Sequence, residues 1–325
     1  MQNDVFLDVR NLTIHYVTSD GRVRAVEDLN LSMNPGETLG LVGETGAGKT
    51  TTVKGIMGIL PDPPAKVLSG EIIFQGEDLL KKNNKEMRKI RGNKISMIFQ
   101  DPMTSLNPVV TVEKQIAESI KLHNKGLSKK EILERTHQML ELVGIQARRG
   151  IEYPHQFSGG MKQRVIIAMA LTCNPVLLIA DEPTTALDVT IQAQVLELMK
   201  KLRKQYKTSM IMITHDLGIV AEVCDRVAIM YAGEIVEYGS RVHIFHSASH
   251  PYTKGLFGCI PNLFGEECEL TPIMGLTPDP VNLPAGCKFH PRCPNYMEIC
   301  KTEMPKSHEI TPNHFVKCHL MKGAQ

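Results

Sequence analysis

Residues 43–50 of this chain form the glycine-rich stretch Gly43-Glu44-Thr45-Gly46-Ala47-Gly48-Lys49-Thr50. It fits the pattern G-x-x-x-x-G-K-[ST], in which glycines let successive backbone N–H groups turn inward onto phosphate oxygens. The apolar run 38–42 before it predicts a buried strand, and residues 51–57 after it can be helical. A bound phosphate would then lie at the positive end of that helix. The strand–loop–helix context therefore predicts a phosphate-binding loop.

Two side chains of this loop have defined tasks in the pattern. Lys49 would reach the β- and γ-phosphates of a nucleotide, and the Thr50 hydroxyl would ligate Mg²⁺. The whole predicted nucleotide-binding stretch comprises Gly43, Glu44, Thr45, Gly46, Ala47, Gly48, Lys49, Thr50 and Thr51.

The composition is that of an ordinary globular chain, with 42% apolar and 22% charged residues. A net charge of +2 argues against a strong nucleic-acid-binding or membrane-binding field. No apolar run approaches the ~18 residues of a membrane-spanning helix, and the N-terminus lacks the pattern of a secretory signal. The 325 residues suffice for one large domain or two ordinary ones.

Hydrophobic periodicity outlines the remaining elements. The first 33 residues and residues 70–75 alternate as strands do, and residues 227–240 predict a hairpin. The signal is helical from about 110 to 173. Within it, a capping box at 128–131 opens a helix that Gly144 closes. We expect this helix to bury three residues on one face: Leu133, Leu140 and Val143.

Two apolar runs deliver polar residues to the edge of a predicted parallel sheet. The run 175–180 ends in Asp181-Glu182, and the run 209–214 ends in His215-Asp216. Open α/β sheets bind ligands at this edge, which favours a Mg²⁺ site over a pair of solvated turn acids. A lone histidine at this place is more often structural than catalytic. Tyr16 is either an ordinary strand aromatic or a residue that stacks on a nucleotide base.

Six of the eight cysteines and ten of the nineteen prolines follow residue 250, which marks a second, loop-rich region. Four of these thiols could form a metal site: Cys287, Cys293, Cys300 and Cys318. An iron–sulfur cluster, a zinc site and free thiols all remain open, although zinc usually shows tighter C-x₂₋₄-C pairs. Cys259 and Cys268 would be bystanders. Under either metal hypothesis some histidines could substitute as ligands: His290, His308, His314 and His319.

Taken together and in order, these motifs resemble the ATP-binding subunit of ABC transporters over residues 5–240. The matching elements are Tyr16, the phosphate loop, Gln100, residues 157–164, 177–182 and 185–188, and His215. One departure stands out. The usual L-S-G-G-Q signature reads Phe-Ser-Gly-Gly-Met at 157–161, although Gln163 places polar capacity nearby.

The resemblance implies an α/β P-loop ABC ATPase. Its expected parts are a RecA-like core, an antiparallel β subdomain, a helical signature subdomain at about 100–173, and a small Cys/Pro-rich C-terminal extension. The expected boundaries are 1–245 for the nucleotide-binding domain and 246–325 for the extension.

The resemblance also implies a mechanism in which two such domains pair head to tail around two ATP molecules. Tyr16 would stack on adenine. Thr50 and Gln100 would ligate Mg²⁺, and Asp181 would hold it through water. Glu182 would be the general base, and His215 would pin the γ-phosphate and the attacking water. The other subunit would cover the γ-phosphate with Ser158, Gly159 and Gly160 and contribute Asp188 to the contact.

Residues 250–256 and 286–294 resemble the C-terminal extension of dipeptide and oligopeptide importer ATPases. In this subgroup the cysteine pattern is associated with a [4Fe-4S] cluster, which favours that cofactor over zinc. Expected partners are a second ATPase chain in a heterodimer or homodimer, two transmembrane permease subunits and, indirectly, an external peptide-binding protein. The chain would sit at the cytoplasmic face of the membrane. Nickel or glutathione are the alternative cargoes.

A soluble ABC ATPase that acts on nucleic acid or ribosomes is the alternative from another functional class. Such proteins carry long coiled-coil insertions or two cassettes in one chain. This sequence has one cassette, no sustained heptads and no strongly basic field. An exporter half would carry fused spanning helices. We therefore expect an importer subunit with no nucleic-acid partner.

Overall fold

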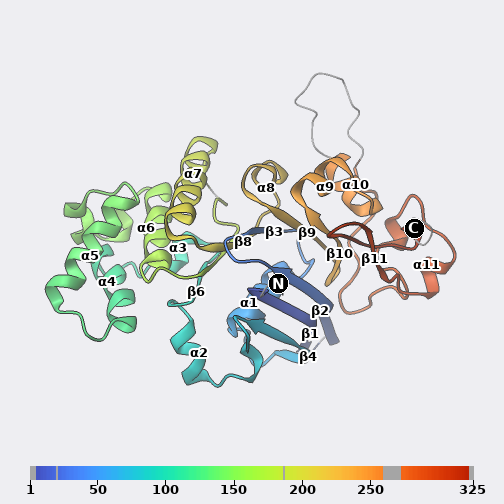
Figure 1. Ribbon diagram of the computed structural model, residues 1–325, viewed down its shortest axis with the longest axis horizontal. Helices are drawn as coiled ribbons and strands as arrows, with labels where there is room; N and C mark the ends of the chain where they lie inside the picture. The colour runs from blue at the N-terminus through green and yellow to red at the C-terminus, as the bar shows by residue number, and fades with distance from the viewer. Residues whose placement is uncertain (1–4, 20, 186, 259–271, 322–325) are drawn as a thin grey trace. The chain divides into compact units, whose positions relative to one another are not determined.

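The structure is a computed structural model that describes residues 5–19, 21–185, 187–258 and 272–321 (Figure 1). Cys259 and Cys268 lie outside the described residues. The chain forms two compact units. Unit 1 contains residues 1–34, 39–80 and 214–325, and unit 2 contains residues 35–38 and 81–213. Among the described residues, none of the helices combines the length and apolar character needed to span a bilayer.

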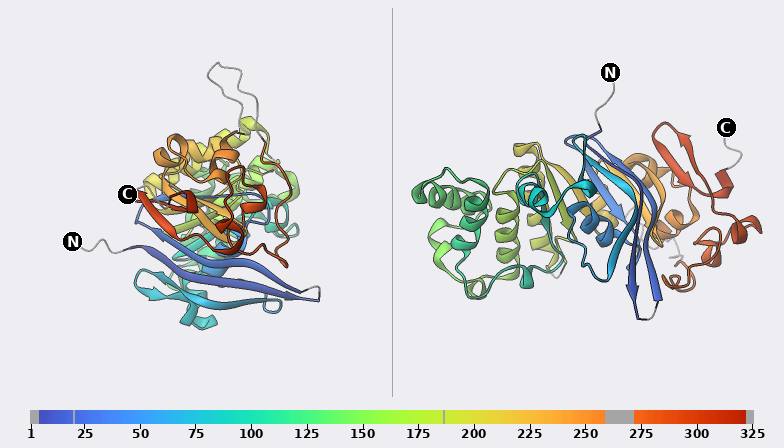
Figure 2. Two further views of the ribbon diagram at one scale, coloured as in Figure 1. Left: turned by 90° about the vertical axis from the view of Figure 1, so that its right-hand side faces the viewer. Right: turned by 90° about the horizontal axis from the view of Figure 1, so that it is seen from below.

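An antiparallel sheet forms one layer of unit 1, with strand order β2-β1-β4-β5. Its strands are β1 (Leu7–Thr18), β2 (Gly21–Met33), β4 (Ala65–Phe74) and β5 (Glu77–Asp78). The long β1–β2 hairpin is seen in dark blue in Figure 2. Alternate side chains of β1 are buried, including Leu7, Leu12 and Ile14. Helix α1 (Lys49–Met57) packs closely here, because a Cβ on Gly55 would lie 2.8 Å from Cδ1 of Ile14. The expected antiparallel β subdomain is confirmed.

The other strands of unit 1 follow the order β11-β12-β10-β9-β3. Strand β3 (Thr38–Val42) runs parallel to β9 (Arg226–Tyr231), and β9 forms the predicted hairpin with β10 (Glu234–Ser240). Strands β11 (Ser307–Thr311) and β12 (His314–Lys317) belong to the C-terminal region and add to β10. The helices of this part are α8 (Leu217–Val223), α9 (Arg241–His246), α10 (Pro251–Gly258) and α11 (Ile299–Thr302), with 3₁₀ turns at His290–Arg292 and His319–Met321.

Two buried glutamates of β10 join the C-terminal region to the rest of unit 1. Glu234 pairs with Lys288, at 2.7 Å between Oε1 and Nζ, and also with Lys317. Glu237 accepts hydrogen bonds from His314 and from the backbone N–H groups of Ser249 and His250, at 2.8–3.0 Å. Burial raises the pKa of Glu237, but these hydrogen bonds outweigh burial and lower it overall. The region from residue 246 onward is thus anchored by satisfied buried charges.

Unit 2 contains three parallel strands in the order β8-β7-β6. They are β6 (Ile95–Ile98), β7 (Leu177–Asp181) and β8 (Ser209–Ile213), and every residue of each is buried. Burial on both faces explains their continuous apolar sequences. The helices are α2 (Asn84–Ile90), α3 (Pro102–Ser105), α4 (Val112–His123), α5 (Lys129–Leu142), α6 (Gly159–Leu171) and α7 (Val189–Tyr206), with 3₁₀ turns at Ala147–Ile151 and Pro154–Gln156. A further 3₁₀ turn, Leu79–Lys81, lies where the chain passes from unit 1 to unit 2.

Helix α5 confirms the predicted capping box and corrects the predicted buried face. Ser128 accepts from the backbone N–H of Glu131, and the Glu131 carboxylate accepts from the backbone N–H of Ser128. Leu140 and Val143 are fully buried, but Leu133 is 44% exposed. Residues 129–135 are exposed or only partly buried, and full burial begins at Thr136. The first turns of α5 are therefore less buried than the rest of the helix, which periodicity alone could not reveal.

Candidate nucleotide-binding site

The predicted site residues fall into two groups, one in each unit. Unit 1 carries Tyr16, the phosphate loop and His215. Unit 2 carries Gln100, the Ser158-Gly159-Gly160 stretch, Asp181, Glu182 and Asp188.

The glycines of the phosphate loop occupy places where a side chain would collide with backbone. A Cβ on Gly43 would lie 2.1 Å from the carbonyl oxygen of Met230, and one on Gly48 would lie 2.2 Å from that of Ala25. Gly48 also has φ of +100° and caps α1, whose first turn contains no acidic residue. The helix therefore presents unopposed positive backbone charge to the loop. This is the geometry that binds a phosphate.

Lys49 lies folded onto its own loop. Its Nζ donates to the carbonyl oxygens of Gly43 at 2.6 Å and of Glu44 at 2.9 Å. A nucleotide phosphate would offer this ammonium a charged acceptor in place of a neutral carbonyl. The Tyr16 hydroxyl lies 3.3 Å from Oγ1 of Thr51, so Tyr16 stands next to the first turn of α1. His215 is exposed and directly precedes Asp216, the N-cap of α8.

In unit 2 the two acids at the end of β7 have different surroundings. Asp181 is the last residue of the strand and is only 2% exposed. Glu182 has φ of +46°, an unusual conformation for a residue with a side chain, and its N–H donates to the carbonyl of Ile213. Its Oε2 accepts from Nε2 of Gln100 and from Oγ1 of Thr185, each at 3.0 Å. The predicted Mg²⁺ ligand and the predicted base are therefore direct neighbours.

The signature stretch begins helix α6. Ser158 is the N-cap and accepts from the backbone N–H of Met161 at 3.4 Å, and both Ser158 and Gly159 are exposed. Gly160 packs on α7, because a Cβ there would lie 2.3 Å from Cγ2 of Ile191. Asp188 caps α7 by accepting from the N–H of Ile191 at 3.0 Å. The signature and Asp188 thus share one local framework at the starts of two helices.

The structure corrects the expectation for Gln163. Gln163 is 1% exposed, and its side-chain amide donates to the carbonyl oxygen of Pro183. It therefore does not provide a polar group at the exposed signature. Met161 replaces the usual glutamine, and its sulfur accepts a hydrogen bond from Nη1 of Arg149 at 3.4 Å. Arg149 is itself ion-paired to Glu152.

The predicted ligands of a metal cofactor are four cysteines of the C-terminal region. The part of the chain that the structure describes contains no group of three or more His, Cys, Asp or Glu side chains placed to hold a metal ion. Cys287, Cys293, Cys300 and Cys318 are all free thiols. The pKa of Cys287 is raised to about 11, first by burial and then by the charges of the other three of these four thiols. In number and donor type they fit an iron–sulfur cluster.

Three of the four histidines proposed as substitute ligands are hydrogen-bonded elsewhere. His314 bonds to Glu237, His319 to the carbonyl of Glu303, and His290 to the carbonyl of Cys287.

Sequence reasoning missed two residues that contact the phosphate loop. Arg292 forms an ion pair with Glu44, and Tyr252 accepts the backbone N–H of Glu44. Both occur in stretches that carry the family resemblance, but no local pattern connects them to a residue more than 200 positions away.

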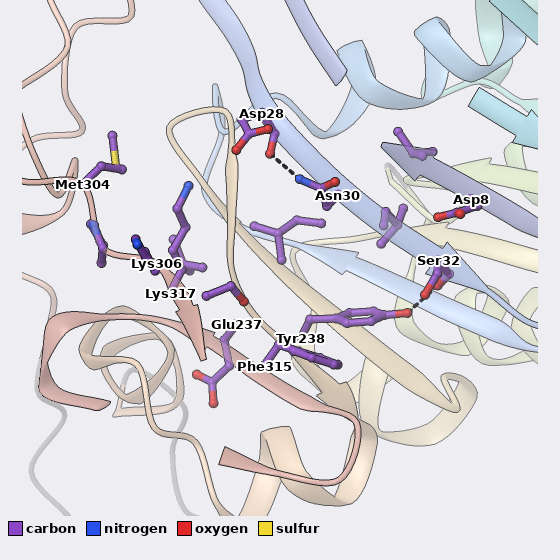
Figure 3. A pocket seen from close by; sticks show the side chains of 16 residues that line it. Asp8, Asp28, Asn30, Ser32, Glu237, Tyr238, Met304, Lys306, Phe315 and Lys317 are labelled. Atoms are coloured by element: carbon purple, nitrogen blue, oxygen red, sulfur yellow. Dashed lines mark hydrogen bonds between the residues drawn. The ribbon is translucent and has the colours of Figure 1, made fainter. Parts of the chain in front are cut away.

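Unit 1 also contains a hollow of about 590 Å³, whose lining includes Glu237 and Lys317 (Figure 3). Strands β1, β2, β10 and β12 contribute to its wall, and the Tyr238 hydroxyl in it donates to the carbonyl of Ser32. None of the predicted site residues lines this hollow.

A glycine-shaped phosphate loop at the start of a helix, together with adjacent acids at the end of a parallel strand, defines a P-loop ATPase. Comparison with known proteins narrows this class. Residues 26–185 match the ABC transporter family, and residues 236–300 match the oligopeptide/dipeptide transporter C-terminal region.

Curated relatives match over nearly the whole chain. The dipeptide transport ATP-binding protein DppD of Bacillus subtilis is 52% identical over 316 residues, which cover 97% of this chain and 94% of the relative. The oligopeptide transport ATP-binding protein OppD of Escherichia coli is 48% identical and covers 98% and 94%. The chain therefore belongs to the ATP-binding subunits of dipeptide and oligopeptide ABC transporters, and it is an ATP hydrolase.

Solved structures agree with this assignment. The ATP-binding cassette MJ0796, solved as a dimer in a post-hydrolysis state with ADP and Pi, superimposes with a TM-score of 0.65 at 28% identity. The match covers 72% of this chain and 98% of that one. The cassette cbiO1 from Clostridium perfringens superimposes with a TM-score of 0.64 at 30% identity, covering 75% and 92%.

Proposed function

We propose that this chain hydrolyses ATP to drive the import of dipeptides or oligopeptides through membrane-bound permease subunits. The observation that carries the proposal is the combination of the phosphate loop with full-length similarity to dipeptide and oligopeptide transport ATP-binding proteins. The C-terminal region matters most for the cargo, because the cassette alone is common to all ABC ATPases. Residues 1–245 would form the nucleotide-binding domain and residues 246–325 the extension.

In this proposal the residues of the chain divide the work of phosphoryl transfer to water. Tyr16 stacks on adenine, residues 43–51 hold the phosphates, and Lys49 leaves its carbonyl partners to reach the β- and γ-phosphates. Glu182 accepts a proton from the water as the water oxygen attacks the γ-phosphorus, and the bond to the β-phosphate oxygen breaks to release ADP. His215 orients the γ-phosphate and that water. Most of the rate acceleration comes from positioning and charge stabilisation.

The proposed Mg²⁺ ligands are Thr50 and Gln100, with Asp181 acting through water. The bound ion would neutralise charge on the β- and γ-phosphates. Gln100 donates its amide N–H to Glu182, which leaves its amide oxygen as the atom that ligates a cation. The buried position of Asp181 suits a carboxylate that holds an ion.

The proposed active form is a head-to-tail pair of ATPase chains. The exposed Ser158 and Gly159, with Gly160 and Asp188, would cover the ATP held by the partner chain. The partner is a second ATPase chain in a heterodimer, with a homodimer as the alternative. Two transmembrane permease subunits bind this pair at the cytoplasmic face of the membrane, and an external binding protein delivers the cargo. Nucleic acid is not a partner.

The four thiols of the C-terminal region are proposed to hold a [4Fe-4S] cluster, with Zn²⁺ as the alternative. Their number, their donor type and their free state support this assignment. The cluster would act first as a covalent staple for a Pro-rich segment with little apolar core. Iron, sulfide and zinc analysis of the purified protein distinguishes a cluster, a zinc site and thiols without metal.

The test of the cargo is uptake by proteoliposomes that contain the chain and its co-purified membrane subunits, with ATP on the side of the ATPase. We expect ATP-dependent accumulation of a labelled dipeptide or oligopeptide when the external binding protein is supplied. Lys49→Ala should abolish it. The matched control Lys54→Ala changes a lysine of the same helix that the proposal leaves outside the site, and it should retain uptake.

Uptake of nickel or glutathione, but of no peptide, would replace the cargo and leave the ATPase assignment intact. Peptide uptake that persists in Lys49→Ala would contradict the assignment of this chain as the motor. Co-purification of the chain with ribosomes or nucleic acid, without membrane subunits, would favour the soluble class of ABC ATPase.

A further inference from the structure

Glu44, the second residue of the phosphate loop, is held by two residues of the C-terminal region. Its carboxylate forms a two-pronged ion pair with Arg292, at 2.7 Å between Nη1 and Oε2 and 3.0 Å between Nη2 and Oε1. Its backbone N–H donates to the hydroxyl of Tyr252 at 2.9 Å. All three residues belong to unit 1. Both the side chain and the backbone of one loop residue are therefore fixed from far along the chain.

Arg292 is itself immobilised. Only 6% of its side chain is exposed, against 27% for that of Glu44. It also donates to the carbonyl of Met274 and to the hydroxyl of Tyr231, and its guanidinium lies 5.8 Å from the centroid of the Tyr231 ring. The hydrogen bonds to Glu44 raise the pKa of Arg292, so it stays charged. A planar guanidinium fixed on three sides defines the position of the carboxylate that it binds.

Tyr252 is equally fixed. It is fully buried, and its ring lies 4.6 Å from that of Tyr231 and 5.4 Å from that of Phe289, centroid to centroid. Burial raises the pKa of Tyr252, so its hydroxyl remains protonated at physiological pH. The backbone segment that carries Arg292 is also anchored, because Lys288 forms an ion pair with Glu234 and donates to the carbonyl of Ala232. The contacts to Glu44 thus arise from a rigid support.

Glu44 connects this support to the phosphate-binding lysine. The carbonyl of Glu44 accepts from Nζ of Lys49 at 2.9 Å, so the residue that the C-terminal region holds is also a resting partner of Lys49. Arg292 also compensates the negative charge of Glu44, which lies within the loop that binds the triphosphate. Without Arg292, this carboxylate would repel the phosphates.

We propose that Arg292 and Tyr252 are positioning residues that hold Glu44, and through it the phosphate loop, in the shape and charge state that bind the ATP phosphates. The C-terminal region is then part of the nucleotide site of its own chain and not only an appendage to the cassette. This inference rests on the proposed binding of ATP at residues 43–51.

The decisive experiment measures ATP affinity and steady-state ATPase kinetics of the complete transporter complex carrying Arg292→Gln. We expect Kd and KM for ATP to rise about tenfold, while kcat at saturating ATP stays within about twofold, because the loop shape is lost but the reacting groups are untouched. The matched control Lys254→Gln changes an exposed lysine of the C-terminal region, on the same helix as Tyr252, and should keep both constants.

The double variant Glu44→Gln/Arg292→Gln separates charge balance from folding. It removes the unbalanced carboxylate but does not restore the ion pair that shapes the loop, so we expect it to recover ATP affinity only in part, to within about threefold of the unchanged protein. Tyr252→Phe should raise KM in the same direction as Arg292→Gln, through loss of one acceptor. It provides the test if Arg292→Gln does not fold.

If Arg292→Gln and Tyr252→Phe bind ATP as tightly as Lys254→Gln does, the inference is overturned while the proposed function stays intact. A fall in kcat with unchanged KM would also overturn it, because that result would place Arg292 at the chemical step. If Lys49→Ala binds ATP as well as the unchanged protein does, the proposed function fails, and this inference fails with it.

Discussion

Gly48 and Gly46 show how differently two glycines of one loop are constrained. Both have positive φ, +100° and +83°, but a Cβ on Gly48 would lie 2.2 Å from a backbone oxygen, whereas one on Gly46 would meet no heavy atom within 4 Å. We expect Gly48→Ala to lower the free energy of unfolding by about 2–5 kcal/mol, from backbone strain plus collision, and to abolish ATP binding. Gly46→Ala should cost about 1–2 kcal/mol, from strain alone.

Urea unfolding and a nucleotide-binding titration of the two variants check this prediction. Equal losses for both alanine variants would mean that the collision at Gly48 relaxes without cost.

Single residues were predictable wherever a local pattern carries their chemistry. The loop glycines, Lys49 and the acids at 181–182 follow from short motifs whose spacing the phosphate and the sheet edge dictate. Arg292 was not predictable in this way, because its partner Glu44 lies 248 positions earlier and only tertiary packing brings them together. The inward orientation of Gln163 was missed for the same reason, since α6 buries residues almost all round.

For helices and strands, sequence periodicity located most of the elements but predicted less well which of their residues are buried. The continuous apolar runs became the buried strands β7 and β8, and the capping box opened α5 as predicted. Leu133 is 44% exposed, because it lies in the first turns of α5, which are less buried than the rest of the helix. The strands β11 and β12 were not predicted, because their alternation is short and polar, and β12 is held to β10 by buried ion pairs such as that of Lys317 with Glu234.

The Cys-rich element offers a prediction of its own. Protein purified without oxygen should be brown and contain about four irons per chain, and Cys287→Ser or Cys300→Ser should remove the colour and the iron. Cys173→Ser, which changes a free thiol in unit 2, is the matched control and should keep both. Visible absorption with iron, sulfide and zinc analysis is the measurement.

One zinc per chain in colourless protein would replace the cluster by a structural Zn²⁺ site. Colourless protein without metal would remove the metal proposal and leave the ATPase assignment unchanged.

In the whole molecule, the C-terminal region belongs to the same compact unit as the phosphate loop of the ATP-hydrolysing cassette. Buried ion pairs at Glu234 and Glu237 and the contacts to Glu44 make this region a structural part of that unit. A cassette shortened before residue 246 would lose these partners of Glu234 and Glu237. The C-terminal region thus has a physical role beyond its use as a family marker.

The role of Glu182 as general base is tested by comparing ATP binding and ATP hydrolysis in the unchanged complex and in Glu182→Gln. The substitution keeps the size of the side chain and removes its ability to accept a proton. We expect ATP affinity to stay within about threefold, ATP-bound dimers to accumulate, and turnover to fall by about 10²–10⁴. Full turnover in Glu182→Gln would show that Glu182 is not the general base.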